Sequence, residues 1–154
     1  MSAVDYVGRY VDLVVFHGTE AVGDVPLTQA LTPPGQSGAV STGIVKLGQR
    51  FLLELLTERG SVLYRPSRGS TFLTEVRSQR IRTVTDLRAA LSRGLLDVRR
   101  NLQGEDSDKY PLDEQYGGAV VDHVTLHNGY ARIYISVRSR DANVKVILPI
   151  NISV

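Results

Sequence analysis

The sequence predicts a single α+β domain spanning residues 1–154, in which two main helices pack on an antiparallel β-meander after an N-terminal strand and a long flexible arm. Apolar residues recur at helical spacing in two middle segments, and they alternate with polar residues in the last third of the chain. The dipeptide Asn128-Gly129 marks a tight turn between two of the alternating segments. With 154 residues and no Cys, the chain can bury a core without disulfides, which suits a reducing compartment.

The N-terminal quarter divides into a strand and an arm. Residues 10–16 are apolar and rich in β-branched and aromatic side chains, which favours a mostly buried strand. Residues 17–42 are rich in Gly, Pro, Thr, Ser and Gln and include Pro33-Pro34-Gly35, a run that opposes regular structure. We therefore expect a long loop or arm there, of a length that is usually functional or mobile.

A first helix is expected over residues 44–58, where apolar residues at 44, 47, 51 and 55 form a wide stripe. Gly60 is its expected stop. The other face carries charged residues at four-residue steps, with Arg50 and Glu54 placed to pair in solvent. These charged residues are Lys46, Arg50, Glu54 and Glu58.

A second, longer helix is expected over residues 84–102, with apolar residues at 84, 87, 91, 95, 98 and 102 on one side. Thr83, followed three residues later by Asp86, resembles a capping box in which Asp replaces the usual Glu or Gln. Between the two helices, residues 70–79 are expected to form a short helix. Its buried side chains would be Phe72, Leu73 and Val76.

The last third of the sequence is predicted to form three antiparallel strands. Residues 130–138 and 144–154 each alternate apolar with polar side chains, the period of a strand with one buried face. Residues 119–126 precede them, and the Asn-Gly turn joins the first pair as a hairpin. Pro149 cannot donate a ladder hydrogen bond, so the last strand is expected at an edge of the sheet.

Charge is unevenly distributed although the formal net charge is only +2. Residues 65–100 contain nine arginines against three acids, and residues 105–114 are acidic. A solvated basic face beside a solvated acidic loop is one interpretation, and pairing with carboxylates on neighbouring proteins is another. Nucleic-acid binding would need aromatic side chains for stacking, and only Tyr64 and Phe72 lie nearby, so we expect no nucleic-acid partner.

Catalytic patterns are scarce. The sequence has no GxSxG, HExxH, GxxxxGK[ST] or GxGxxG motif. His123 and His127 are spaced on a strand and its turn, which does not favour a metal site. Glu54 and Glu58 are the best candidate carboxylate pair, but on a solvated helix face beside arginines both would stay ionised, unlike the pair of a glycosidase. We therefore expect no catalytic residue, metal or cofactor, and no apolar run is long enough for a membrane partner.

One segment, residues 52–70 with the sequence LLELLTERGSVLYRPSRGS, resembles the baseplate wedge, or sheath-initiator, family of contractile phage tails, also described as lysozyme-like baseplate wedge subunits. In that family an apolar helix ends in a Gly-containing turn with nearby Glu and Arg, followed by an apolar stretch, a Pro and a further Gly. The matching positions here are Thr57, Glu58, Arg59, Gly60, Pro66 and Gly69. The family's Glu-Pro-Arg triplet near the C-terminal strands has no counterpart, since Asp97-Val98-Arg99 is only a distant echo.

The resemblance implies a structural subunit of the virion's tail baseplate, assembled in the host cytoplasm, that nucleates the contractile sheath by sharing β-strands with the first sheath ring. Its implied partners are the tail sheath protein and other baseplate wedge proteins, in multiple copies within a symmetric assembly. An exposed strand edge has the chemistry for such pairing. A different tail or neck adaptor and a cell-wall-degrading enzyme are the alternatives.

The predicted partner-binding residues form two groups. The last strand supplies the edge, and the segment after the first helix supplies a connector. They are Val144, Lys145, Val146, Ile147, Leu148 and Ile150 on the strand, and Arg65, Pro66 and Gly69 on the connector.

Overall fold

The protein is described by a computed structural model that covers residues 43–106, 110–141 and 145–154, together with four two-residue strands nearer the N-terminus. Apart from these short strands, the predicted strand over residues 10–16 and the predicted arm over residues 17–42 lie outside the described residues. The short strands form two antiparallel pairs. They are β1 (Asp12–Leu13) with β4 (Val40–Ser41), and β2 (Ala21–Val22) with β3 (Val25–Pro26).

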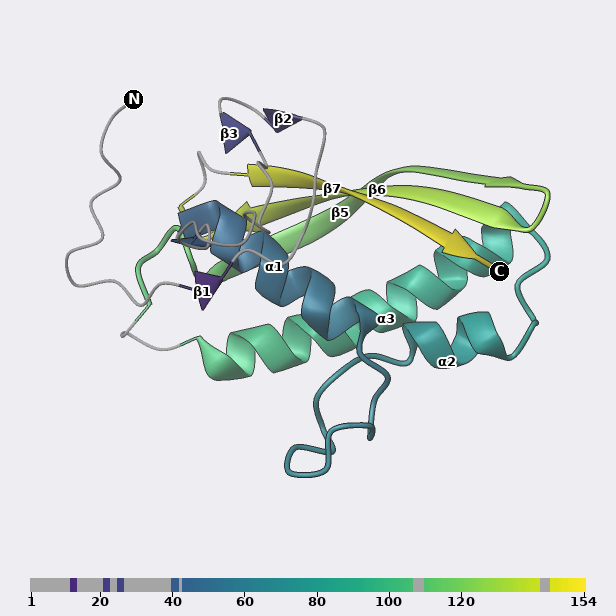
Figure 1. Cartoon of the computed structure of the whole chain (residues 1–154), viewed down its shortest axis with the longest axis horizontal. Helices are drawn as coiled ribbons and strands as arrows, with labels where there is room; N and C mark the ends of the chain where they lie inside the picture. Colours follow the sequence, from purple (N-terminus) through teal and green to yellow (C-terminus); the bar gives the residue numbers. More distant parts are fainter. Residues whose placement is uncertain are drawn as a thin grey trace, which may run out of the picture.

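The main body has two layers, a three-stranded antiparallel sheet and a layer of helices that covers one of its faces (Figure 1). This arrangement confirms the mixed α+β class. The first helix lies on the second and third strands of the sheet, and the longest helix lies on the first strand. The helices are α1 (Gly43–Leu56), α2 (Phe72–Arg77) and α3 (Val84–Glu105), and the strands are β5 (Tyr116–His127), β6 (Tyr130–Ser139) and β7 (Lys145–Ser153).

Helix α1 forms the centre of the molecule. Leu47, Phe51 and Leu55 have no exposed surface, as the apolar stripe predicts. The expectation of a solvated opposite face is wrong, because Lys46 and Glu54 are also buried, among contacts from distant segments. The helix ends at Leu56, two residues before the predicted end. The carbonyl of the next residue, Thr57, accepts a hydrogen bond from the Ser70 amide, on the far side of the following loop.

Helix α3 begins with the predicted capping box. The Thr83 hydroxyl accepts a hydrogen bond from the Asp86 amide at 3.1 Å, and an Asp86 carboxylate oxygen accepts one from the Thr83 amide at 3.0 Å. That carboxylate oxygen also accepts a bond from the Arg82 amide at 3.1 Å. Three backbone N–H donors at the start of the helix are thereby satisfied.

These hydrogen bonds hold the pKa of Asp86 below its ordinary value, with the Thr83 side chain as the largest cause. Because the pKa is lower in the folded state, the carboxylate stabilises the fold above its unfolded pKa of about 3.9, and this stabilisation is lost as the pH falls through the folded value. We expect Asp86→Asn to lower the melting temperature at pH 7 and to differ little from the parent chain at pH 2. Thermal unfolding of both, with Thr83→Ser as a variant that keeps the cap, measures this. An equal difference at both pH values would contradict it.

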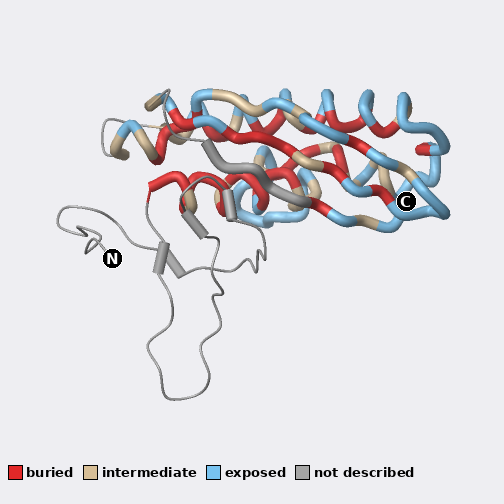
Figure 2. The backbone as a smooth tube through the Cα atoms, turned by 90° about the horizontal axis from the view of Figure 1, so that it is seen from above, coloured by how far each residue is buried: buried red, intermediate tan, exposed pale blue. Residues whose placement is uncertain are grey.

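The sheet follows the predicted meander in the order β5-β6-β7. Asn128 and Gly129 form the β5–β6 turn with φ of 49° and 77°, the positive values that this dipeptide tolerates. Inward positions on all three strands pack against the helices, and Figure 2 shows buried and exposed residues segregated between the interior and the outside. Strand β7 lies at an edge of the sheet, as Pro149 predicts. The buried apolar residues of the sheet, among those described, are Tyr116, Val124, Ala131, Ile133, Ile135, Val137 and Ile150.

Candidate protein-docking site

The outer edge of β7 is the first candidate docking surface. Within the described part of the chain, β7 pairs through its backbone with β6 alone, and β2 lies against it without pairing. The Val154 amide donates to the Gly129 carbonyl at 2.8 Å, immediately beyond the last register pair, Tyr130 with Ser153. Because antiparallel strands bond through alternate residues, this contact fixes which β7 backbone groups face β6.

Even-numbered residues of β7 therefore bond toward β6, and odd-numbered residues direct their N–H and C=O groups to the outer edge. Pro149 lies opposite Tyr134 at an odd position. Its missing N–H thus removes no bond from the β6–β7 ladder and leaves a gap in the outer row of donors. The outer edge has donors at residues 145, 147, 151 and 153, which the gap separates into two pairs.

The register with β6 gives the strand position of each predicted partner-binding residue of β7. Val146, Leu148 and Ile150 lie opposite Val137, Ile135 and Ile133 in the register, and Ile150 is only 4% exposed. Lys145 and Ile147 lie opposite Arg138 and Ser136 in the register. Val144 lies outside the described residues.

The predicted edge over residues 144–154 includes two further residues that were not singled out as partner-binding, Asn151 and Ser153, and both are exposed. Alternation alone marked them as outward. Only the register, however, shows that their backbone groups also point to the free edge.

The connector after α1 is a loop over residues 57–70 that projects from the body of the protein (Figure 1). Two backbone bonds close its base, from the Ser70 amide to the Thr57 carbonyl at 2.8 Å and from the Arg59 amide to the Ser70 carbonyl at 3.1 Å. Gly69 has a φ of 88°, and a Cβ there would lie 2.5 Å from the Thr57 carbonyl oxygen. It is buried, so it shapes the loop rather than offering a surface.

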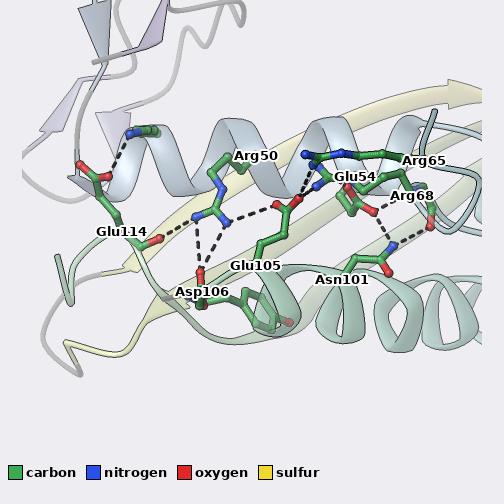
Figure 3. Close-up of polar contacts among 11 residues, drawn as sticks. Arg50, Glu54, Arg65, Arg68, Asn101, Glu105, Asp106 and Glu114 are labelled. Carbon is green, nitrogen blue, oxygen red and sulfur yellow. Dashed lines mark hydrogen bonds and ion pairs between the residues drawn. The ribbon is translucent and has the colours of Figure 1, made fainter. Parts of the chain in front are cut away.

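A polar clamp centred on the buried Glu54 holds this base to both long helices (Figure 3). Glu54, only 2% exposed, accepts a bond from the Gly69 amide and pairs with Arg68, both at 2.7 Å. Asn101 of α3 donates to the carbonyls of Ser67 and Gly69, each at 3.1 Å, and also to Glu54. The clamp is defined by these five residues, and it makes the loop a firmly supported element.

Arg50 does not form the predicted pair with Glu54. Its guanidinium lies 3.4 Å from Asp106 and 3.7 Å from Glu105, and it donates to the Glu114 carbonyl at 3.1 Å (Figure 3). Glu54 lies one helical turn from Arg50 on α1. Arg50 pairs instead with the two carboxylates at the C-terminal end of α3. Glu105 is shared with two loop residues, Arg65 at 3.2 Å and Arg68.

Three carboxylates of the acidic segment over residues 105–114 are therefore used inside the protein. Glu114 is 1% exposed, pairs with Lys46 at 3.1 Å and accepts a bond from the Gly43 amide at 3.0 Å. The expectation of solvated loop charge is wrong for Glu105, Asp106 and Glu114. Each of these carboxylates pairs with a residue that is distant in the sequence, so the local charge pattern could not reveal the contact.

The tip of the loop is apolar and fully exposed. Leu63 and Tyr64 are 90% and 96% exposed, and the predicted residues Arg65 and Pro66 beside them are exposed as well. The site prediction left out Leu63 and Tyr64. The signal for them was a run of three apolar residues between Gly60 and Pro66 that no helical or strand period explains.

Several arginines of the basic segment also have internal partners, which reduces the positive charge offered to a ligand. Arg59 pairs with Asp97 at 3.2 Å, and Arg93 pairs with Glu75. The hydrogen bond from Arg93 is the largest cause that lowers the pKa of Glu75. These arginines therefore join different elements of the fold to one another.

The carboxylate pair considered for catalysis is held in structural contacts. Glu54 belongs to the clamp, and Glu58 accepts bonds from Thr74 at 3.0 Å and from Arg77 at 2.5 Å. Searched over the described residues alone, the structure holds no group of three His, Cys, Asp or Glu side chains suited to a metal ion. No helix in that same portion has the length and apolar character needed to cross a membrane.

Comparison with protein-family models, with curated proteins and with solved structures finds no match for this chain.

Proposed function

We propose that the chain is a structural baseplate subunit of a contractile phage tail that nucleates the sheath by sharing β-strands with the first sheath ring. The proposal rests on the resemblance of residues 52–70 to the sheath-initiator family and on the form of the β7 edge. Other baseplate wedge proteins are the second class of partner, as the family resemblance implies.

The observation that carries the proposal is that the outer edge of β7 pairs with no other strand among the residues that the structure describes. An exposed row of N–H and C=O groups accepts a strand from another chain through main-chain hydrogen bonds, while alternate side chains give specificity. Ile150 is part of the core and Ile152 packs against it, so the C-terminal part of the edge is presented by a well anchored strand. Strand addition then needs little rearrangement of this subunit.

The connector loop supports a role in assembly independently. Its base is clamped by buried polar contacts, and its tip presents Leu63 and Tyr64 almost completely to solvent. Tyrosine is a typical anchor residue of protein interfaces, and a preorganised support lowers the cost of ordering it on binding. We assign this tip to contacts with neighbouring wedge proteins, separate from the strand edge.

The double variant Ile147→Pro/Asn151→Pro tests the strand-sharing function. Both residues direct their N–H groups outward, so proline removes two outer donors and leaves the β6–β7 ladder bonded. We expect particles that carry this variant to lack an assembled sheath in electron micrographs. The control Ile147→Ala/Asn151→Ala keeps both N–H groups and should form sheaths.

Circular dichroism and thermal unfolding of the purified variants establish that both are folded. Normal sheaths on particles with the folded double proline variant would show that the β7 edge does not nucleate the sheath.

A further inference from the structure

The outer edge of β7 is not uniform along its length. Pro149 stands at its midpoint and provides an outward carbonyl but no outward N–H. An added strand that spanned the whole edge would leave one of its own acceptors unpaired opposite Pro149. Pairing is therefore favoured on one side of Pro149, and the question is which half receives the partner.

The C-terminal half is the better supported of the two. Ile150 is buried, Ile152 and Val154 pack against the core, and the Val154 amide is bonded to the Gly129 carbonyl. Between these anchors, Asn151 and Ser153 are exposed and present two donors in succession. With the carbonyl of Pro149, they form an unbroken outward run of donors and acceptors.

A hollow of about 580 Å³ adjoins this half of β7 on the outer face of the sheet. Its lining includes Asn151, Arg132 and Tyr130 together with the turn residue Asn128. Arg132 lies directly opposite Asn151 in the register and is exposed. Among the residues that the structure describes, it has no carboxylate partner, so the hollow carries an unneutralised guanidinium beside the edge.

We infer that the sheath strand docks on the C-terminal half of β7, along residues 151–153, and carries an acidic side chain that binds Arg132 in the adjoining hollow. The inference rests on the proposed function and specifies the partner as an extended acidic segment. Main-chain bonds supply the strand pairing, and the guanidinium–carboxylate contact sets its register.

The direction in which the β7 N–H groups point is tested first on the purified protein, without any partner. Amide hydrogen exchange should be fast at Asn151 and Ser153, whose N–H groups point outward, and slow at Ile150 and Ile152, whose N–H groups bond to β6. Protection at Asn151 and Ser153 equal to that at Ile150 and Ile152 would overturn the assignment of the outer edge.

The docking half is then tested in particles with two matched pairs of variants. Asn151→Pro removes a donor from the C-terminal half, and Ile147→Pro removes one from the N-terminal half. Arg132→Glu reverses the charge in the hollow, and Arg138→Glu reverses an exposed charge on the same strand opposite Lys145. We expect the first member of each pair to reduce the fraction of particles with sheaths by about tenfold or more, and the second to leave it nearly unchanged.

The outcomes separate the two proposals. Loss of sheaths with Ile147→Pro and Arg138→Glu, but not with their counterparts, would overturn the C-terminal docking half and leave strand sharing intact. Normal sheaths with all four single variants would overturn the docking half, and normal sheaths with the double proline variant as well would overturn strand sharing itself. Thermal unfolding of each purified variant identifies any that has lost its fold, and Asn151→Ala, which keeps the N–H, must behave like the parent chain.

Discussion

Glu54→Ala is expected to lower the free energy of unfolding by about 3–5 kcal/mol, the loss typical of removing one member of a buried ion pair. The substitution removes the acceptor for the Gly69 amide and the carboxylate that faces Arg68 and Asn101. The buried Gly69 amide would be left without its acceptor, while Arg68 and Asn101 would each lose one of their partners. The loop base should therefore loosen along with the loss in global stability.

Denaturant unfolding of the purified protein measures the effect. Glu58→Ala is the matched control, because Glu58 lies four residues further along the chain, just beyond the end of α1, and pairs with Arg77 at the surface, where such pairs contribute about 0–1 kcal/mol. Glu54→Gln keeps an acceptor oxygen and should lie between the two. Equal losses for Glu54→Ala and Glu58→Ala would show that the clamp does not stabilise the fold.

Lys46→Met is expected to have an effect of similar size, about 3–5 kcal/mol. Glu114 is almost fully buried, and its side chain bonds to the Lys46 ammonium and to the amide at the start of α1. Methionine fills a similar volume but provides no charge, so the buried carboxylate would lose its cation. The unfavourable burial of that charge is the source of the loss.

The double variant Lys46→Met/Glu114→Gln separates charge from packing. Glutamine keeps an acceptor for the Gly43 amide and removes the buried charge, so the double variant should recover most of the stability that Lys46→Met loses. Chemical unfolding of the parent, both single variants and the double variant gives the coupling energy between the two residues. Strictly additive losses would contradict a direct buried pair.

Periodicity predicted the helices, the meander and the Asn-Gly hairpin because these features depend on residues close together in the sequence. It failed for Lys46 and Glu54, since a polar stripe on a helix was taken to face water. Their partners, Glu114 and Arg68, come from segments that only the tertiary fold brings near. The same reason explains why Arg50 pairs with the end of α3 instead of its helical neighbour.

The candidate site was predictable to a similar extent. Pro149 alone indicated an edge strand, and the order of the sheet confirms it. The direction of each backbone group required the register with β6, which no single-strand pattern contains. The loop tip had a local signal, the apolar run from Val62 to Tyr64. An apolar run alone does not distinguish buried from exposed residues, and these are exposed because the loop projects from the body.

The closed base of the connector loop has a consequence for the integrity of the chain. Backbone bonds between Thr57, Arg59 and Ser70, together with the buried contacts of Glu54, hold the two ends of the loop side by side. A single peptide-bond cut between Leu63 and Tyr64 would therefore leave both ends fastened to the same helices. The tip is thus a natural place at which the polypeptide can be divided into two complementary fragments that remain one folded unit.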